Sequence, residues 1–323
     1  MNPQAVPPAE TPDRRIMTVC GPLIIPGRGI VEAHNHAWIE SVPGTGSGFV
    51  LNQLAPILAE LQDYARAGGI GIVDCQPGGC GRNGLRLRDL MAQSGVFIVA
   101  ATGYHLPKYY PPAAPIWGMD EEQAYHYFGG ELQTGLTETL RLPQPVRAGF
   151  IKIACQESLE QTPPALLRAA AAVCRDLDCA VEVHTEKGAA MAEIADFFVR
   201  QGADLGRLVL CHVDKRPDFG LHRELARAGV LLEYDTFYRP KYRPEANVWP
   251  LIGKMLSAGL AGQVALATDM AESTSWKSMG GEPGLAALPQ DAPAHLQAMG
   301  AQPAEIAALM GLNITGRIAR PVG

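Results

Sequence analysis

The chain has 323 residues, of which 47% are hydrophobic and 19% are charged, so it is able to bury a large core. Its 27 Lys and Arg residues and 33 Asp and Glu residues give a net charge of −6, which argues against nucleic acid or an anionic membrane surface as a partner. The start of the chain lacks the basic and apolar pattern of a secretory signal, and no stretch approaches the ~18 apolar residues of a membrane span. Because the number of cysteines is odd, at 7, we expect a protein of the reducing cytoplasm.

Short apolar runs that are rich in β-branched residues recur along the chain and predict eight β-strands. Segments with helical periodicity separate these runs, which repeat about every 33 residues, close to the length of a βα unit. The runs are almost wholly apolar, as parallel strands are when both faces of the sheet are covered. We therefore predict an α/β protein with a (β/α)8 TIM barrel as a single domain over residues 16–323, and residues 1–15 as a mobile tail. The predicted strands cover residues 29–36, 69–75, 96–103, 149–155, 179–185, 207–213, 230–235 and 263–269.

An open, doubly wound sheet is the main alternative to the barrel. Such a sheet normally has a glycine-rich turn directly after its first strand, whereas the first strand here ends in His-Asn-His. A glycine-rich segment at residues 78–84 follows the second strand, but it has neither the GxGxxG order nor the lysine of a P-loop. We interpret this segment as a barrel loop, with a nucleotide site as the alternative.

Ionisable residues stand at or near the ends of five predicted strands. In a barrel these positions approach the C-terminal face, where active sites of this fold lie. The first pair, His34 and His36, is two residues apart on an extended strand, so both rings point to the same side. Two converging imidazoles suit a divalent cation of the zinc type, although a hydrogen-bonded buried histidine is the simpler alternative. The full set is His34, His36, Lys152, His184, His212 and Asp269.

The other members of this set strengthen the prediction of a metal site. His184 and His212 close neighbouring strands, so we expect their rings side by side, and Asp269 offers an anionic ligand unless it is only a hydrogen-bonded buried aspartate. Lys152 lies within an apolar strand, where an ammonium group is costly unless it is paired, neutral or modified. It could reach solvent or pair with Glu182 on the adjacent strand. A neutral lysine amine can instead add carbon dioxide, which gives a carbamate able to bridge two cations.

These positions resemble the phosphotriesterase family of the amidohydrolase superfamily from about residue 16 to the C-terminus. The stretches that carry the resemblance are TVCGPL, AHNHAW, GIVDC, FIKIA, EVHTEKG, CHVDKRPD, ATDM and LMGLNITGRIA. The family's first motif usually reads HEH, whereas Asn35 separates the two histidines here. Because Asn35 is expected to point away from the metals, this departure changes little.

The resemblance implies a binuclear metal site with a metal-bound hydroxide as nucleophile. By position, His34, His36 and Asp269 would hold the more buried ion, His184 and His212 would hold the more exposed one, and carbamylated Lys152 would bridge both. Asp269 would also accept the hydroxide proton and pass it to the leaving group, as the catalytic base. Zinc is the first choice, and manganese or cobalt are alternatives, with carbon dioxide required for the carbamate.

A basic loop after the seventh strand predicts an anionic small-molecule substrate, although a solvated basic rim is the alternative. The segment TGYH after the third strand, together with RPKY in this loop, is similar to the branch of the family that hydrolyses sugar lactones, often phosphorylated ones. A phosphotriesterase or other phosphoester hydrolase, or a metal-stabilised binding protein without turnover, remains an alternative, and the oligomeric state stays open, with a homodimer as one outcome. Three further histidines, His126, His222 and His295, are expected at the surface. The candidate substrate-binding residues are His105, Lys215, Arg239, Lys241 and Tyr242.

Overall fold

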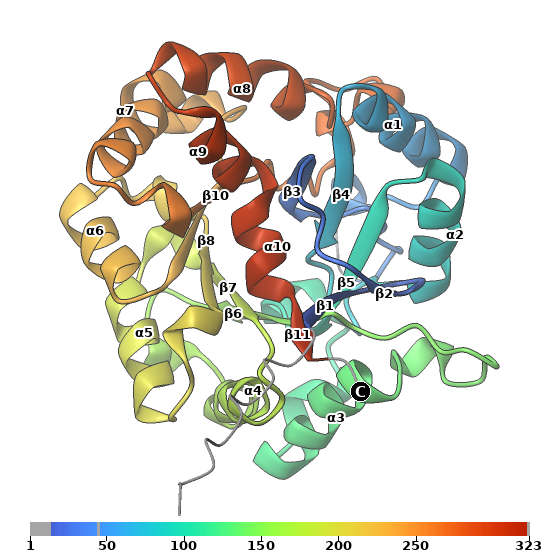
Figure 1. Cartoon of the computed structure of the whole chain (residues 1–323). Coiled ribbons are helices and arrows are strands. Elements are labelled where there is room, and N and C mark those ends of the chain that lie inside the picture. Colours follow the sequence, from blue (N-terminus) through green and yellow to red (C-terminus); the bar gives the residue numbers. More distant parts are fainter. Residues whose placement is uncertain (1–13, 44–45, 322–323) are drawn as a thin grey trace, which may run out of the picture.

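The computed structural model describes residues 14–43 and 46–321, and it contains eight parallel strands in a nearly closed barrel with helices between them (Figure 1). The predicted TIM barrel is confirmed, and every predicted strand range contains one barrel strand. The strands pair in chain order, and the N–H of Asp269, beyond the last strand, donates to the carbonyl of His34 on the first over 3.1 Å. The barrel strands are β3 (Ile30–Asn35), β4 (Gly69–Asp74), β5 (Phe97–Gly103), β6 (Phe150–Cys155), β7 (Val181–Thr185), β8 (Leu208–Cys211), β9 (Leu231–Tyr234) and β10 (Val264–Leu266).

Helices lie around the barrel, and several of them begin with a side-chain cap. The Asn83 side chain accepts the N–H of Arg86 at the start of α2, and Asp120 forms a capping box with Gln123 at the start of α3. No helix among the described residues is long and apolar enough to cross a membrane. The helices are α1 (Leu54–Arg66), α2 (Gly84–Ser94), α3 (Glu121–Gln133), α4 (Pro164–Leu177), α5 (Met191–Arg200), α6 (Phe219–Arg227), α7 (Pro244–Ser257), α8 (Ala287–Ala298), α9 (Pro303–Ala307) and α10 (Asn313–Ile318).

The two ends of the described chain meet in a small antiparallel sheet that adjoins the barrel. Strand β1 (Arg14–Thr18) pairs with β2 (Gly21–Leu23) and with β11 (Arg320–Pro321). Arg14 and Arg15 therefore belong to a strand, and the rest of the predicted tail, residues 1–13, lies outside the described residues. At the N-terminal end of the barrel, Arg317 of α10 donates to the carbonyls of Leu205 and Gly229.

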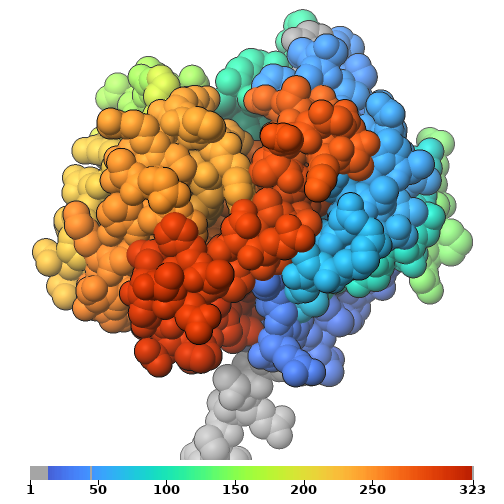
Figure 2. All heavy atoms as spheres, turned by 90° about the horizontal axis from the view of Figure 1, so that it is seen from above, coloured from blue at the N-terminus to red at the C-terminus, as the bar shows by residue number. Residues whose placement is uncertain are grey.

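The first and last barrel units also join on the outside of the barrel. Figure 2 shows residues from the last third of the chain, coloured orange to red, against blue residues from its start. At this seam the buried carboxylate of Glu60 on α1 accepts the N–H of Ser278 over 2.7 Å and the N–H of Leu285 over 2.9 Å. These contacts fix the loop after β10 against α1.

Candidate functional site

The strand alternation directs charged side chains into the barrel. On β9, Leu231 belongs to the interior apolar cluster, whereas Leu232 and Tyr234 pack on the outside among the helices. Because successive side chains of a strand alternate between its faces, Glu233 and Asp235 point inward. Lys152 enters the interior by the same rule from β6. An apolar strand sequence can therefore carry buried charges at every second position.

Three of the predicted ligands converge at the junction of the first and last barrel units. Possible ligand atoms of His34, His36 and Asp269 all lie within 4.8 Å of one another. The Oδ1 atom of Asp269 is 3.7 Å from Nε2 of His34 and 3.5 Å from Nε2 of His36. Two imidazoles and a carboxylate at this separation form a donor set that suits zinc and similar ions.

The other two predicted histidines adjoin this group. The ring centroids of His184 and His212 are 4.6 Å apart, and those of His212 and His34 are 4.8 Å apart. The Nε2 atom of His184 is buried, makes no hydrogen bond among the described residues and lies 3.6 Å from Oε2 of Glu186. One cavity of about 210 Å³ is lined by His34, His36, His184, His212 and Asp269, together with His105, Lys215, Arg239, Lys241 and Tyr242.

Lys152 lies beneath this cavity and does not line it. Its Nζ atom is 3.4 Å from Oε1 of Glu182 and 3.2 Å from Sγ of Cys211. Burial by itself would lower the pKa of Lys152, but Cys211, Cys75 and Glu182 outweigh it and raise that pKa well above its usual value. The structure thus shows the pairing with Glu182 that the sequence left as an alternative.

Asp269 forms an ion pair that the sequence did not indicate. Nη2 of Arg239 lies 2.9 Å from Oδ2 of Asp269 and also donates to the backbone carbonyl of Asp269. Burial would raise the pKa of Asp269, but His212 and Arg239 outweigh it and hold that pKa well below its usual range. Arg239, predicted as a substrate-binding residue, is therefore not a free anion-binding group in this structure.

Two of the remaining basic residues of the cavity, Lys215 and Lys241, lie around one phenol, whereas Lys108 lies against the ring of Tyr109. The Nζ atoms of Lys215 and Lys241 lie 5.7 Å and 5.0 Å from the centre of the Tyr242 ring. The cavity wall also carries Glu186 and Glu272, so its charge is mixed rather than purely basic. The positive groups are concentrated on the side formed by the loops after β8 and β9.

His105 presents a fixed polar group to the same cavity. Its Nδ1 atom accepts the backbone N–H of Leu106 over 2.7 Å, and its ring lies 5.0 Å from that of His184. Burial, helped by His184, holds the pKa of His105 well below its usual value, so the ring is neutral. The single ring proton is therefore on Nε2, which makes this atom a hydrogen-bond donor.

A scan against protein-family models matches residues 18–309 to the phosphotriesterase family. The chain belongs to this family. Family members are hydrolases, and the ligand-type residues described above come from the strand ends on which the resemblance rests.

Individual relatives of the phosphotriesterase family differ in what they cleave. A phospho-furanose lactonase from Mycoplasmopsis synoviae is 24% identical over 266 residues, which are 78% of this chain and 75% of the relative. An N-acetyltaurine hydrolase from Salmo salar is 28% identical over 212 residues, which are 64% of this chain but only 59% of that protein. A lactonase from Listeria monocytogenes superposes with a TM-score of 0.84 at 20% identity, covering 96% of this chain and all 100% of the other, and shows the shared fold.

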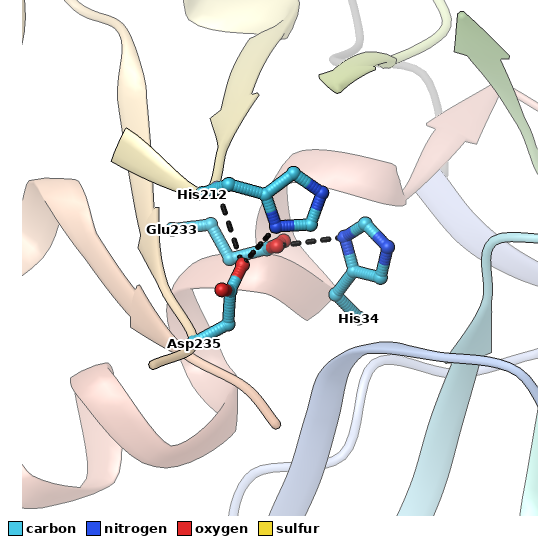
Figure 3. A group of neighbouring side chains, drawn as sticks. All are labelled: His34, His212, Glu233 and Asp235. Atoms are coloured by element: carbon cyan, nitrogen blue, oxygen red, sulfur yellow. Dashed lines mark hydrogen bonds and ion pairs between the residues drawn. The ribbon is translucent and has the colours of Figure 1, made fainter. Parts of the chain in front are cut away.

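Sequence reasoning missed the groups that hold the histidines. Nδ1 of His34 lies 2.7 Å from Oε1 of Glu233, Nδ1 of His36 lies 2.7 Å from Oε1 of Gln76, and Nδ1 of His212 bonds to Asp235. The only signal for Glu233 was a carboxylate inside an apolar strand. Figure 3 shows Glu233 and Asp235 facing His34 and His212.

One expectation about the remaining histidines is wrong. His222 is fully buried, with Nδ1 2.8 Å from the hydroxyl of Tyr234 and Nε2 3.0 Å from the carbonyl of Arg216. Burial lowers the pKa of His222 to about 4. It lies on the inner face of α6 and packs within the fold, whereas His126 is exposed as expected.

Proposed function

We propose that the chain is a metal-dependent hydrolase that opens the ester of a small anionic lactone, with a phosphorylated sugar lactone as the best candidate. The observation that carries this proposal is the convergence of five ligand-type side chains on a cavity whose wall also holds Lys215, Lys241 and Tyr242. Metal ligation and anion binding would then act on the same small molecule.

The donor set supports two divalent ions, with zinc first and manganese or cobalt as alternatives. His34, His36 and Asp269 would hold one ion, and His184 and His212 would hold the other. Such ions lower the pKa of bound water and polarise a carbonyl. Lys152 would bridge the pair as a carbamate, after its ammonium loses one proton and the neutral nitrogen adds carbon dioxide and releases a second proton to solvent.

The chain's own groups would then handle the proton and the carbonyl. Asp269, kept ionised by Arg239, would accept the proton of the attacking water and pass it to the leaving alkoxide. The Nε2–H of His105 would donate to a substrate oxygen near His184. Both groups line the cavity, so neither has to move into it.

Two ammonium groups and a phenol around one point suit the oxygens of a phosphate. The lactonase names among the relatives agree with this substrate class, and the N-acetyltaurine hydrolase shows that other bonds are cleaved by similar chains. A phosphoester hydrolase with the same ions is the second candidate, and a binding protein without turnover is the third.

A substrate panel with metal-loaded protein tests the proposal. It contains a phosphorylated furanose lactone, the same lactone without phosphate, a phosphotriester and an N-acyl amino sulfonate. We expect the highest kcat/KM for the phosphorylated lactone. A preference for the phosphotriester or the amide would overturn the lactonase assignment, and no turnover with two ions bound would favour the binding protein.

A further inference from the structure

Strand β9 and the residue that directly follows it carry two carboxylates that reach two different histidines of the site. Oε1 of Glu233 lies 2.7 Å from Nδ1 of His34, and Asp235 bonds to Nδ1 of His212 (Figure 3). The four side chains are buried. In the proposed metal site these two histidines belong to different ions, so one short segment, residues 233–235, contacts one ligand of each.

Glu233 is the closest of three groups around Nδ1 of His34. Oε1 of Glu182 is 3.0 Å from this nitrogen, and Nζ of Lys152 is 3.3 Å from it. The Glu182 oxygen also accepts from Cys75 over 2.9 Å and pairs with Lys152 over 3.4 Å, so it is shared. Among the described residues, Oε1 of Glu233 forms a hydrogen bond to His34 alone.

We propose that Glu233 is a positioning residue, which holds the His34 ring with Nδ1–H toward β9 and Nε2 toward Asp269 and thereby sets the affinity of the ion held by His34. The inference rests on the proposed metal site. The Nε2 atom of His34 already lies 3.7 Å from Oδ1 of Asp269, on the side where that ion would be bound.

The physical basis is that the two nitrogens of an imidazole ring take different roles. When Nδ1 donates to a fixed oxygen, Nε2 keeps its lone pair for a cation, and the ring cannot rotate freely. A carboxylate acceptor also makes the coordinating nitrogen more basic, and loss of such a partner typically lowers metal affinity about 10- to 100-fold. Glu233 would therefore act on binding through His34, without touching the ion.

Three variants test this role. Glu233→Leu removes the acceptor, whereas Glu233→Gln keeps an amide oxygen, as Gln76 already supplies for His36. Glu60→Leu is the control, because Glu60 is an equally buried carboxylate that, within residues 14–43 and 46–321, bonds only backbone N–H groups at the α1 seam. Zinc and cobalt affinities of metal-stripped protein are measured by competition with a chelator, and thermal unfolding is recorded for each variant.

We expect Glu233→Leu to weaken one of the two ions about 10- to 100-fold. Glu233→Gln should remain within a few-fold of wild type, and Glu60→Leu should lose stability but not affinity. In cobalt-loaded protein, the exchangeable Nδ1–H proton resonance of His34 should persist in Glu233→Gln and disappear in Glu233→Leu.

The possible failures are distinguishable. If Glu233→Leu binds both ions as wild type does, the positioning role is overturned while the metal site stands. Equal losses in the Leu and Gln variants, or in Glu60→Leu, would also overturn it, because charge or general stability would then explain the effect. If wild type binds no ion, the proposed function falls together with this inference.

Discussion

Arg239 donates to the carboxylate of Asp269 over 2.9 Å and so ties the loop after β9 to the residue proposed as the proton acceptor. The same guanidinium also bonds the backbone carbonyl of Asp269, where the backbone adopts a positive φ of 49°. Arg239 is thus placed to orient Asp269, which gives it a role that does not depend on a substrate phosphate.

Replacement of Arg239 by alanine should therefore lower turnover of every substrate. A charge-assisted hydrogen bond is worth about 1.5–3 kcal/mol, which corresponds to a fall in kcat/KM of about 10- to 150-fold. We expect similar losses for a phosphorylated lactone and for its neutral analogue, measured by steady-state kinetics with both. A loss confined to the phosphorylated lactone would instead assign Arg239 to the substrate anion.

Lys241 provides the complementary test of the anion site. It is exposed beside the Tyr242 ring and has no described ion-pair partner, so Lys241→Met should leave the fold intact. Because an exposed contact to phosphate is worth about 1 kcal/mol, KM for the phosphorylated lactone should rise about 5-fold. The neutral lactone should be unaffected. Equal changes for both lactones would show that this loop is a solvated basic rim that does not bind the substrate phosphate.

Lys152→Ala should abolish activity and release at least one ion, because the proposed bridge is lost. In metal-free protein, where Lys152 pairs with Glu182, the variant should also destabilise the fold, because Glu182 then keeps, among the described residues, only its contacts to His34, Cys75 and Cys211, so unfolding must be recorded beside activity. A short carboxylic acid in solution should restore part of the activity, and Lys152→Glu should keep some. Wild-type activity in Lys152→Ala would show that Lys152 does not bridge the two ions.

The burial of His222 predicts a pH dependence of stability. As pH falls, the unfolded chain takes up a proton at His222 near its ordinary pKa of 6.5, whereas the folded protein does so only near a pKa of about 4. The stability is therefore complete above about pH 6.5 and is lost by about 3 kcal/mol as pH falls to about 4.

The comparison of wild type with His222→Gln isolates this contribution, because other groups titrate alike in both proteins. The difference between their free energies of unfolding, from denaturant titrations between pH 4 and pH 7, should shrink as pH falls. A difference that stays constant with pH would show that His222 accepts its proton in the folded state.

The barrel and the meeting of the five ligand-type residues could be predicted because both follow from local pattern and repeat length. Strand-end histidines in successive βα units must approach one another whatever the loops do. The Arg239–Asp269 pair could not be predicted, because it depends on how two loops fold over the barrel. Glu233 was missed because an apolar strand gave no sign of which histidine its carboxylate would face, and His222 because the inner face of α6 is set by packing.

The metal content of active protein tests the central claim most directly. Purified enzyme is assayed for lactone hydrolysis and analysed for divalent metals in the same sample, before and after chelation and after reloading with zinc, manganese or cobalt. We predict two ions per chain, loss of activity with loss of the ions, and recovery on reloading. Full activity in protein that carries one ion or none would contradict the binuclear site.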